Sequence, residues 1–241
     1  MLTFKDLKIK VNGRELFELK DLSLGHGLVA LVGRNGAGKS TFLRSIMGLH
    51  QDYSGAILLN DTNTKSFSRV ELAKEIAIVY SKASIFGNHS GRDVLILGRL
   101  PYQNAFARIK KEDHEKVNAV IELFGLADFV DQEFTSLSDG EKQLIMIGRA
   151  LVQETKIILL DEPGAFLDVV NRYRMNEILQ KIAKESDRLI LYSTHDIESL
   201  QENADKVLLI DNNRIELLAD KLTFKRDIFK IFGLKRESDE I

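Results

Sequence analysis

Apolar residues fall into short, almost continuous runs that are bounded by polar or turn residues. Such runs span residues 28–32, 157–160, 189–192 and 207–210. Runs of this length are typical of strands buried on both faces of a parallel sheet. Helical periodicity separates them, as in Val117, Val120, Ile121 and Phe124, which are spaced i, i+3, i+4, i+7 before Gly125. This alternation predicts an α/β fold with a mainly parallel sheet.

The rest of the chain adds three features to this core. Residues 2–11 and 55–60, near turn signals such as Asn12-Gly13, predict an N-terminal antiparallel β region. From about residue 84 to 151 helical patterning replaces strands, which predicts a helical sub-lobe inserted in the core. Phe224, Ile228 and Phe232 repeat at helical spacing within a tail at about residues 220–234. We therefore expect a single domain over residues 1–241.

Composition narrows the class of protein. The chain has 241 residues, is 44% hydrophobic, and can bury a sizeable core. It contains no cysteine, which excludes disulfides and thiolate metal sites. The net charge of -2 and the absence of a long basic block argue against a nucleic-acid partner. No run approaches the roughly 18 apolar residues that cross a bilayer, and the first residues lack the apolar core of a signal peptide. We expect any membrane role to operate through another subunit.

A phosphate-binding pattern follows the first apolar run. It reads G-x-x-x-x-G-K-[ST] and comprises Gly33, Arg34, Asn35, Gly36, Ala37, Gly38, Lys39 and Ser40, followed by Thr41. Glycines let consecutive N–H groups point at phosphate oxygens, and the following helix contributes its positive end. Lys39 is expected to reach the β/γ-phosphates, and the Ser40 hydroxyl to ligate Mg²⁺. The pattern therefore predicts binding of a nucleoside triphosphate.

Two adjacent acids, Asp161 and Glu162, end the run at residues 157–160. Side chains alternate along a strand, so neighbouring acids can divide their functions. We predict that Asp161 holds Mg²⁺ and that Glu162 accepts a proton from the attacking water. An apolar strand ending in solvated acids has the same pattern, so this interpretation depends on the phosphate loop.

A third motif, Leu137-Ser138-Asp139-Gly140-Glu141, opens a predicted helix. Ser138 and Glu141 form the S-x-x-E capping box, which alone explains those two residues. It does not explain Gly140. A helix N-terminus is also a favourable place for a γ-phosphate, so the capping and ligand-binding interpretations are compatible.

These motifs, in this order, resemble those of the ATP-binding cassette (ABC) ATPases over about residues 1–215. The usual signature is Leu-Ser-Gly-Gly-Gln, and Asp139 here replaces its first glycine. The resemblance implies ATP hydrolysis with Mg²⁺ in a head-to-tail homodimer, in which each signature closes on the partner's nucleotide. It also implies that Asp168 lies in the loop joining the two sites. By the same resemblance, His195 contacts the γ-phosphate and the attacking water.

The sequence departs from the family at two places. Tyr80-Ser81 stands where the family has Pro-Gln, so Ser81 would offer Mg²⁺ an oxygen only through water. The aromatic residue that stacks on adenine should fall near Val11, where there is none. Phe17 is the predicted substitute, because stacking needs only an aromatic face.

Residues 91–102 bear on the branch of the family. They include Val94, Leu97-Gly98-Arg99 and Pro101-Tyr102. This run resembles the Val-x-x-Leu-Gly-Arg-x-Pro-(His/Tyr) segment of ATPases that serve importers of iron-siderophores, haem and cobalamin. It also fits an ordinary amphipathic helix that ends before Pro101.

The importer hypothesis places the chain at the cytoplasmic face of the inner membrane, as a peripheral subunit. Its partners would be a second copy, integral-membrane permease subunits and an extracytoplasmic substrate-binding protein. Two alternatives share every nucleotide motif: a soluble ABC ATPase acting as an assembly factor, for example in Fe–S cluster building, and the ATPase subunit of an exporter.

Overall fold

A mixed β-sheet runs through the centre of the molecule. The computed structural model describes residues 1–82, 85, 87–103 and 109–233. The sheet order is β6-β5-β1-β2-β11-β10-β4-β9-β8-β7, and β3 pairs with β1. In chain order the strands are β1 (Leu2–Val11), β2 (Arg14–Leu19), β3 (Leu22–Leu24), β4 (Gly27–Gly33), β5 (Tyr53–Leu59), β6 (Thr62–Asn63), β7 (Ile76–Val79), β8 (Ile157–Leu160), β9 (Leu189–Thr194), β10 (Lys206–Asp211) and β11 (Arg214–Leu218).

Strands β10, β4, β9, β8 and β7 form a parallel block, in that order. All seven residues of β4 and all four of β8 are buried, as their continuous apolar sequence predicts. Each apolar run singled out above lies within one of these strands. The α/β fold with a mainly parallel sheet is therefore confirmed.

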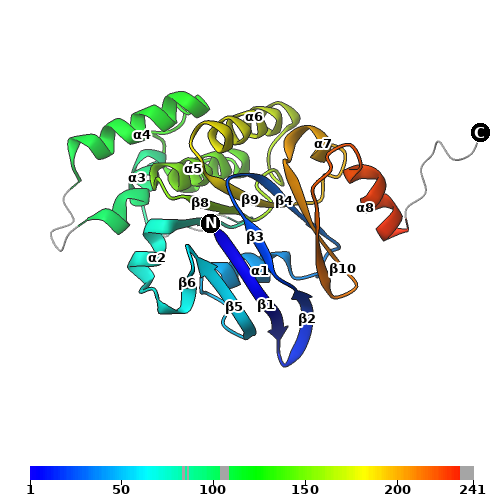
Figure 1. Ribbon diagram of the computed structural model, residues 1–241. Helices are drawn as coiled ribbons and strands as arrows, with labels where there is room; N and C mark the ends of the chain where they lie inside the picture. The colour runs from blue at the N-terminus through cyan, green and yellow to red at the C-terminus, as the bar shows by residue number, and fades with distance from the viewer. Residues whose placement is uncertain (83–84, 86, 104–108, 234–241) are drawn as a thin grey trace, which may run out of the picture.

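Helices cover both faces of the sheet (Figure 1). Helices α4, α5 and α6 lie on one side, and α1 lies on the other. The α-helices are α1 (Lys39–Ile46), α2 (Arg69–Glu75), α3 (Gly91–Ile96), α4 (Lys111–Phe124), α5 (Asp139–Val152), α6 (Val169–Glu185), α7 (Leu200–Asn203) and α8 (Phe224–Phe232), and the 3-10 helices are η1 (Thr64–Ser66), η2 (Leu97–Tyr102) and η3 (Phe134–Ser136). None of the helices in the described ranges is long and apolar enough to cross a bilayer.

The N-terminal strands form the expected antiparallel region, in which β1 pairs with β2, β3 and β5. Asn12 and Gly13 both have positive φ, 51° and 77°, in the tight turn between β1 and β2. A similar turn at Asn212 and Asn213 leads into β11, which the apolar pattern missed. Only Ile215 of that strand is buried, so it carries little hydrophobic signal.

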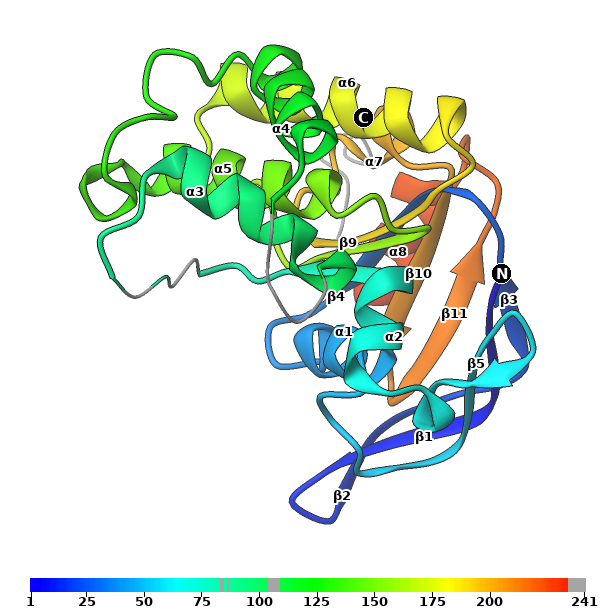
Figure 2. The same cartoon turned by 90° about the vertical axis from the view of Figure 1, so that its left-hand side faces the viewer.

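Between β7 and β8 the chain is mainly helical, and Figure 2 shows α3, α4 and α5 gathered on one side of the molecule, away from β1, β2 and β5. We refer to α3 through α5 as the helical sub-lobe. Residue 84, the predicted start of this sub-lobe, and residue 234, the predicted end of the tail, lie outside the described residues.

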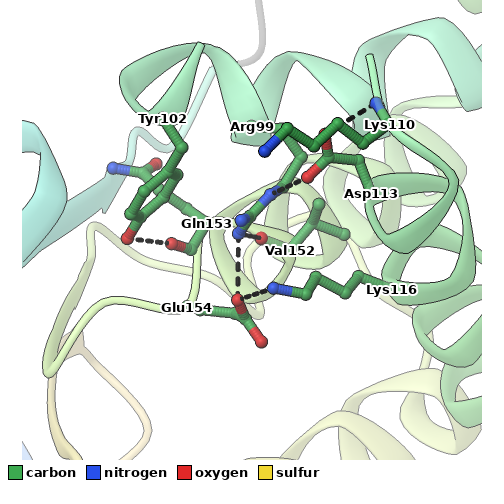
Figure 3. A network of polar contacts seen from close by, with 8 residues as sticks. All are labelled: Arg99, Tyr102, Lys110, Asp113, Lys116, Val152, Gln153 and Glu154. Carbon is green, nitrogen blue, oxygen red and sulfur yellow. Dashed lines mark hydrogen bonds and ion pairs between the residues drawn. The ribbon is translucent and has the colours of Figure 1, made fainter.

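An ionic network centred on the buried Arg99 joins the elements of the sub-lobe (Figure 3). The Arg99 guanidinium is 6% exposed and donates to Asp113 (2.8 Å), to the Val152 carbonyl (2.9 Å) and to Glu154 (3.0 Å). Lys116 donates to the same Glu154 oxygen as Arg99. We call this set of five residues the Arg99 network. It joins η2 to the start of α4 and the end of α5.

Candidate active site

The phosphate-loop segment connects β4 to α1. Gly36 and Gly38 have φ values of 78° and 98°, which are accessible to glycine at little cost. A Cβ on Gly38 would lie 2.9 Å from side-chain carbons of both Leu16 and Phe17. Gly38 is also the N-cap of α1, so the loop ends at a helix N-terminus. This is the backbone arrangement that binds phosphate.

Lys39 lies under the loop and is only 6% exposed. Its ammonium group donates to the carbonyls of Gly33 (2.9 Å) and Arg34 (3.4 Å). Burial lowers the pKa of Lys39, while the nearby carboxylates of Glu162 and Asp161 oppose that shift. The lysine thus lies between the loop and the acidic strand end, where it suits an anionic ligand.

The predicted adenine-stacking function of Phe17 is wrong. The Phe17 side chain is fully buried and packs edge-on against Phe42, with the ring centroids 5.9 Å apart. Its ring supports the phosphate loop from beneath, against Gly38. Alternation along β2 places Phe17 on the core face, so its aromatic face is unavailable to a base.

Arg34 lies against the C-terminal helix. Its guanidinium donates to the Phe232 carbonyl (3.2 Å) and lies 5.5 Å from the centroid of the Phe232 ring. The contact joins the phosphate loop to the end of α8, which is distant in sequence.

The carboxyl ends of β8 and β9 bring the predicted acids together. Leu160 pairs with Tyr192, which places Asp161 beside Ser193. Asp161 is 5% exposed, and its Oδ1 accepts a hydrogen bond from the Ser193 hydroxyl at 2.8 Å. The same hydroxyl accepts a hydrogen bond from the Glu162 amide at 2.8 Å. Glu162 itself has a left-handed backbone, with φ of 51°.

His195 contacts Glu162 directly. Its Nε2 lies 2.6 Å from Glu162 Oε1, and the two side chains are 43% and 33% exposed. The pair lies at the solvent-facing end of the parallel strands, where ligands bind in α/β proteins. A carboxylate held by an imidazole at such an edge can accept a proton from water. Ser193 was missed by sequence reasoning, although a buried hydroxyl two residues before His195 was the available signal.

The signature segment begins α5 at a separate place. Ser138 is the N-cap: its hydroxyl accepts from the Glu141 amide (3.3 Å), and its own amide donates to the Glu141 carboxylate (2.8 Å). The predicted capping box is present. Leu137 is buried, while Asp139 is exposed. In the part of the chain that the structure describes, no hydrogen bond joins this segment to residues 33–41.

Gly140 packs closely on the loop that follows β8. A Cβ on Gly140 would lie 3.0 Å from the Phe166 carbonyl. In the same loop, Asp168 is the N-cap of α6 and accepts from the Asn171 amide at 2.7 Å. The signature segment and the loop that carries Asp168 are therefore neighbours within one chain.

Tyr80 and Ser81 follow β7 at the same edge as the acids, because Val79 pairs with Leu160. The Tyr80 ring lies beneath the Arg44 guanidinium, 5.5 Å from centroid to Cζ, and thereby contacts α1. Ser81 is partly buried. Its predicted water-mediated contribution to metal binding stays a prediction.

The donor set suits Mg²⁺ chemically. Asp161 Oδ1 is occupied by Ser193, and Oδ2 makes no hydrogen bond within the described ranges. A carboxylate oxygen and the Ser40 hydroxyl are hard ligands, which Mg²⁺ combines with phosphate oxygens and water. Among the described residues there is no cluster of three or more His, Asp and Glu side chains that would form an all-protein metal cage.

Comparison with known proteins places the chain in a family. Residues 21–165 match the family model described as ABC transporter. An uncharacterised ABC transporter ATP-binding protein of Methanocaldococcus jannaschii is 34% identical over 216 residues, covering 89% of this chain and 74% of that protein. The iron(3+)-hydroxamate import ATP-binding protein FhuC of Bacillus subtilis is 30% identical over 197 residues, covering 81% of this chain and 73% of that protein.

A solved structure agrees with these relatives. It is described as an inward-facing conformation of a putative metal-chelate type ABC transporter, and the aligned chain has a TM-score of 0.80 and 27% sequence identity. The alignment covers 96% of this chain and 88% of the other. The order of the motifs, the fold and the sequence matches all lead to one conclusion. This chain belongs to the ABC transporter family and is an ATPase of that family.

Proposed function

We propose that this ATPase powers the import of a metal chelate, of the iron-siderophore, haem or cobalamin type, through a separate membrane permease. The observation that carries the hydrolytic part is the contact between His195 and Glu162, beside the phosphate loop's strand. The import direction and the cargo class are supported by two similar proteins, an iron(3+)-hydroxamate import ATP-binding protein and a transporter of metal-chelate type.

In this proposal the phosphate loop and Lys39 bind the triphosphate of ATP, and Glu162 accepts a proton from the attacking water while His195 orients its carboxylate. Ser40 and Asp161 would hold Mg²⁺, which neutralises phosphate charge when bound. The Ser138 segment of a second copy would close over the same nucleotide, and Asp168 would lie between the two sites. The need for a second copy is supported by the described hydrogen bonds, none of which joins the Ser138 segment to residues 33–41 of the same chain.

The permease would dock on the sub-lobe side of the molecule. Leu100 on η2 and Val70 on α2 are exposed apolar residues, at 53% and 57%. Tyr102 links the two elements, since its hydroxyl contacts the Lys74 carbonyl at 3.4 Å. We expect the permease contact to extend over residues 81–106, of which residues 83–84, 86 and 104–106 lie outside the described residues.

The run at 91–102 also has structural functions. A Cβ on Gly98 would lie 2.4 Å from the Arg149 carbonyl, and Arg99 centres the buried network. Packing therefore accounts for the Gly-Arg pair. The exposed Leu100 is the part of the run that packing leaves unexplained.

Purification from detergent-solubilised membranes tests the proposal. The tagged chain should recover a stoichiometric polytopic permease, and a Leu100→Asp Val70→Asp variant should recover less of it at unchanged ATPase activity. Loss of metal-chelate uptake in cells lacking the chain would support the cargo class. Recovery only from the soluble fraction, without a membrane protein, would instead favour the assembly-factor alternative.

A further inference from the structure

Ser193 holds both acids of the candidate active site at once. Strand β9 lies between β4, which leads into the phosphate loop, and β8, which leads into the acids. Ser193 is fully buried, and its neighbours along β9 from Leu189 to Tyr192 are apolar and buried. A single hydroxyl in such a strand needs hydrogen-bond partners, and both of its partners belong to the acidic segment.

The direction of each hydrogen bond is fixed by chemistry. The Glu162 amide can only donate, so the Ser193 oxygen accepts from it at 2.8 Å. The hydroxyl proton is then left for Asp161 Oδ1, also at 2.8 Å. The hydroxyl therefore occupies one carboxylate oxygen, and the other makes no hydrogen bond among the described residues.

The contact with Glu162 lies where the backbone leaves the strand. Glu162 adopts a left-handed conformation, φ 51°, which residues with a Cβ rarely adopt. The bond from its amide to Ser193 anchors this turn. Two residues along the chain, His195 holds the carboxylate of the same Glu162 at 2.6 Å. Ser193 and His195 thus fix the backbone and the side chain of Glu162 respectively.

We propose that Ser193 is a positioning residue for hydrolysis, which sets the Asp161 carboxylate for Mg²⁺ and the Glu162 backbone for proton transfer. This inference rests on the proposed functions of Asp161 and Glu162. Residues that orient a metal ligand typically change metal affinity or activity about 10- to 100-fold when removed. The effect of losing the hydroxyl should therefore exceed what a merely structural hydrogen bond would give.

The chain offers a matched control at the other end of β8. Thr155 is also fully buried, and its hydroxyl donates to the Ile157 carbonyl at 2.8 Å. Thr155→Val removes a buried hydroxyl far along the strand from the acids. Ser193→Thr keeps the hydroxyl and adds only a methyl group.

The experiment compares Ser193→Ala, Ser193→Thr and Thr155→Val in the full-length chain. We expect Ser193→Ala to lower kcat about 10- to 100-fold and to weaken Mn²⁺ binding, measured by electron paramagnetic resonance with a non-hydrolysable ATP analogue. ATP binding without metal should stay within about twofold. Ser193→Thr should restore most of the activity, and Thr155→Val should lower only the melting temperature.

Two results separate the possible failures. If Ser193→Ala matches Thr155→Val in kcat and in Mn²⁺ affinity, the positioning function of Ser193 is overturned. A Glu162→Gln variant measured alongside tests the basis of the inference. Full hydrolysis in Glu162→Gln would remove the proposed catalytic function of Glu162 itself, whereas an inactive Glu162→Gln with a normal Ser193→Ala would overturn the inference alone. If Ser193→Thr does not fold, Ser193→Cys replaces it as the variant that keeps a donor.

Discussion

The Arg99 network and the edge formed by Asp161, Glu162 and His195 are two charged clusters that use their hydrogen-bonding capacity differently. In the Arg99 network every charge has a partner: the buried Arg99 guanidinium contacts two carboxylates and a carbonyl, although Glu154 and Lys116 are themselves partly exposed. At the edge formed by Asp161, Glu162 and His195, some hydrogen-bonding capacity is left unused among the described residues. Asp161 Oδ2 has no partner among the described residues, and Glu162 and His195 are about a third to two fifths exposed.

The difference predicts separate roles for the two clusters. Saturated buried charges fix a structure, because removing one partner leaves an uncompensated charge. Polar groups that are held in place but not saturated can still bind a ligand or move a proton. We therefore expect substitutions in the two regions to give separable defects, in stability for one and in activity for the other.

Glu162→Gln is expected to have the largest effect. The amide cannot accept the proton of the attacking water, so kcat should fall about 10²- to 10⁴-fold. The melting temperature should change little, because Glu162 is partly exposed. Steady-state hydrolysis and size-exclusion chromatography with ATP provide the measurement, and ATP-dependent dimerisation should persist. Glu185→Gln, an exposed site on α6, is the control and should be neutral.

Arg99→Met should show the opposite pattern. It leaves Asp113 buried without its ion-pair partner, so the free energy of unfolding should fall by about 3 kcal/mol. Activity per folded molecule should stay within about twofold. Urea denaturation measures the loss, and Arg92→Met, which breaks the exposed pair with Asp131, should cost less than about 1 kcal/mol. Equal losses in the two variants would refute the distinction between saturated and exposed charges.

Ser138→Ala tests a residue that caps helix α5 and is also proposed to contact the partner's nucleotide. Loss of the cap should destabilise the chain by about 1 kcal/mol. Ser68 caps α2 with the same box geometry, to Glu71, so Ser68→Ala should cost about the same. Only Ser138→Ala should also weaken ATP-dependent dimerisation, if its segment contacts the partner's nucleotide. If the two variants show the same stability loss and the same dimerisation, Ser138 acts only as a helix cap.

Lowering the pH should reduce the stability that Asp113 contributes to the Arg99 network, and this effect should be smaller than those of the substitutions above. Burial raises the pKa of Asp113, but hydrogen bonds from the Lys110 amide and from Arg99 outweigh burial and leave the pKa lowered. A carboxylate with a lowered folded-state pKa stabilises the fold above its unfolded-state pKa, and this stabilisation is lost as the pH falls through the folded-state value. Stability should therefore decline below about pH 4. Denaturation curves between pH 5 and 3 measure it, and Asp113→Asn should flatten the decline.

Much of the fold could be predicted from sequence, because a strand buried on both faces is recognisable from the continuous apolar run in its own residues. The run at Ile157–Leu160 coincides with β8, and the phosphate loop is recognisable from spacing alone. Other features depend on what lies across the sheet. Phe17 could be assigned to the core only once β2 was placed, and the function of Ser193 depends on the register between β8 and β9. Neither fact is encoded in a local pattern.

Strand β4 is buried along its whole length and lies between β10 and β9. Its amides reach water only when the sheet itself opens, so their hydrogen exchange should report global unfolding. The phosphate loop begins at the last residue of this strand, so we expect it to be anchored to a slowly exchanging part of the molecule. Local opening of the sub-lobe would expose the amides of α3 and α4 to exchange long before it released the strand that leads into the nucleotide site.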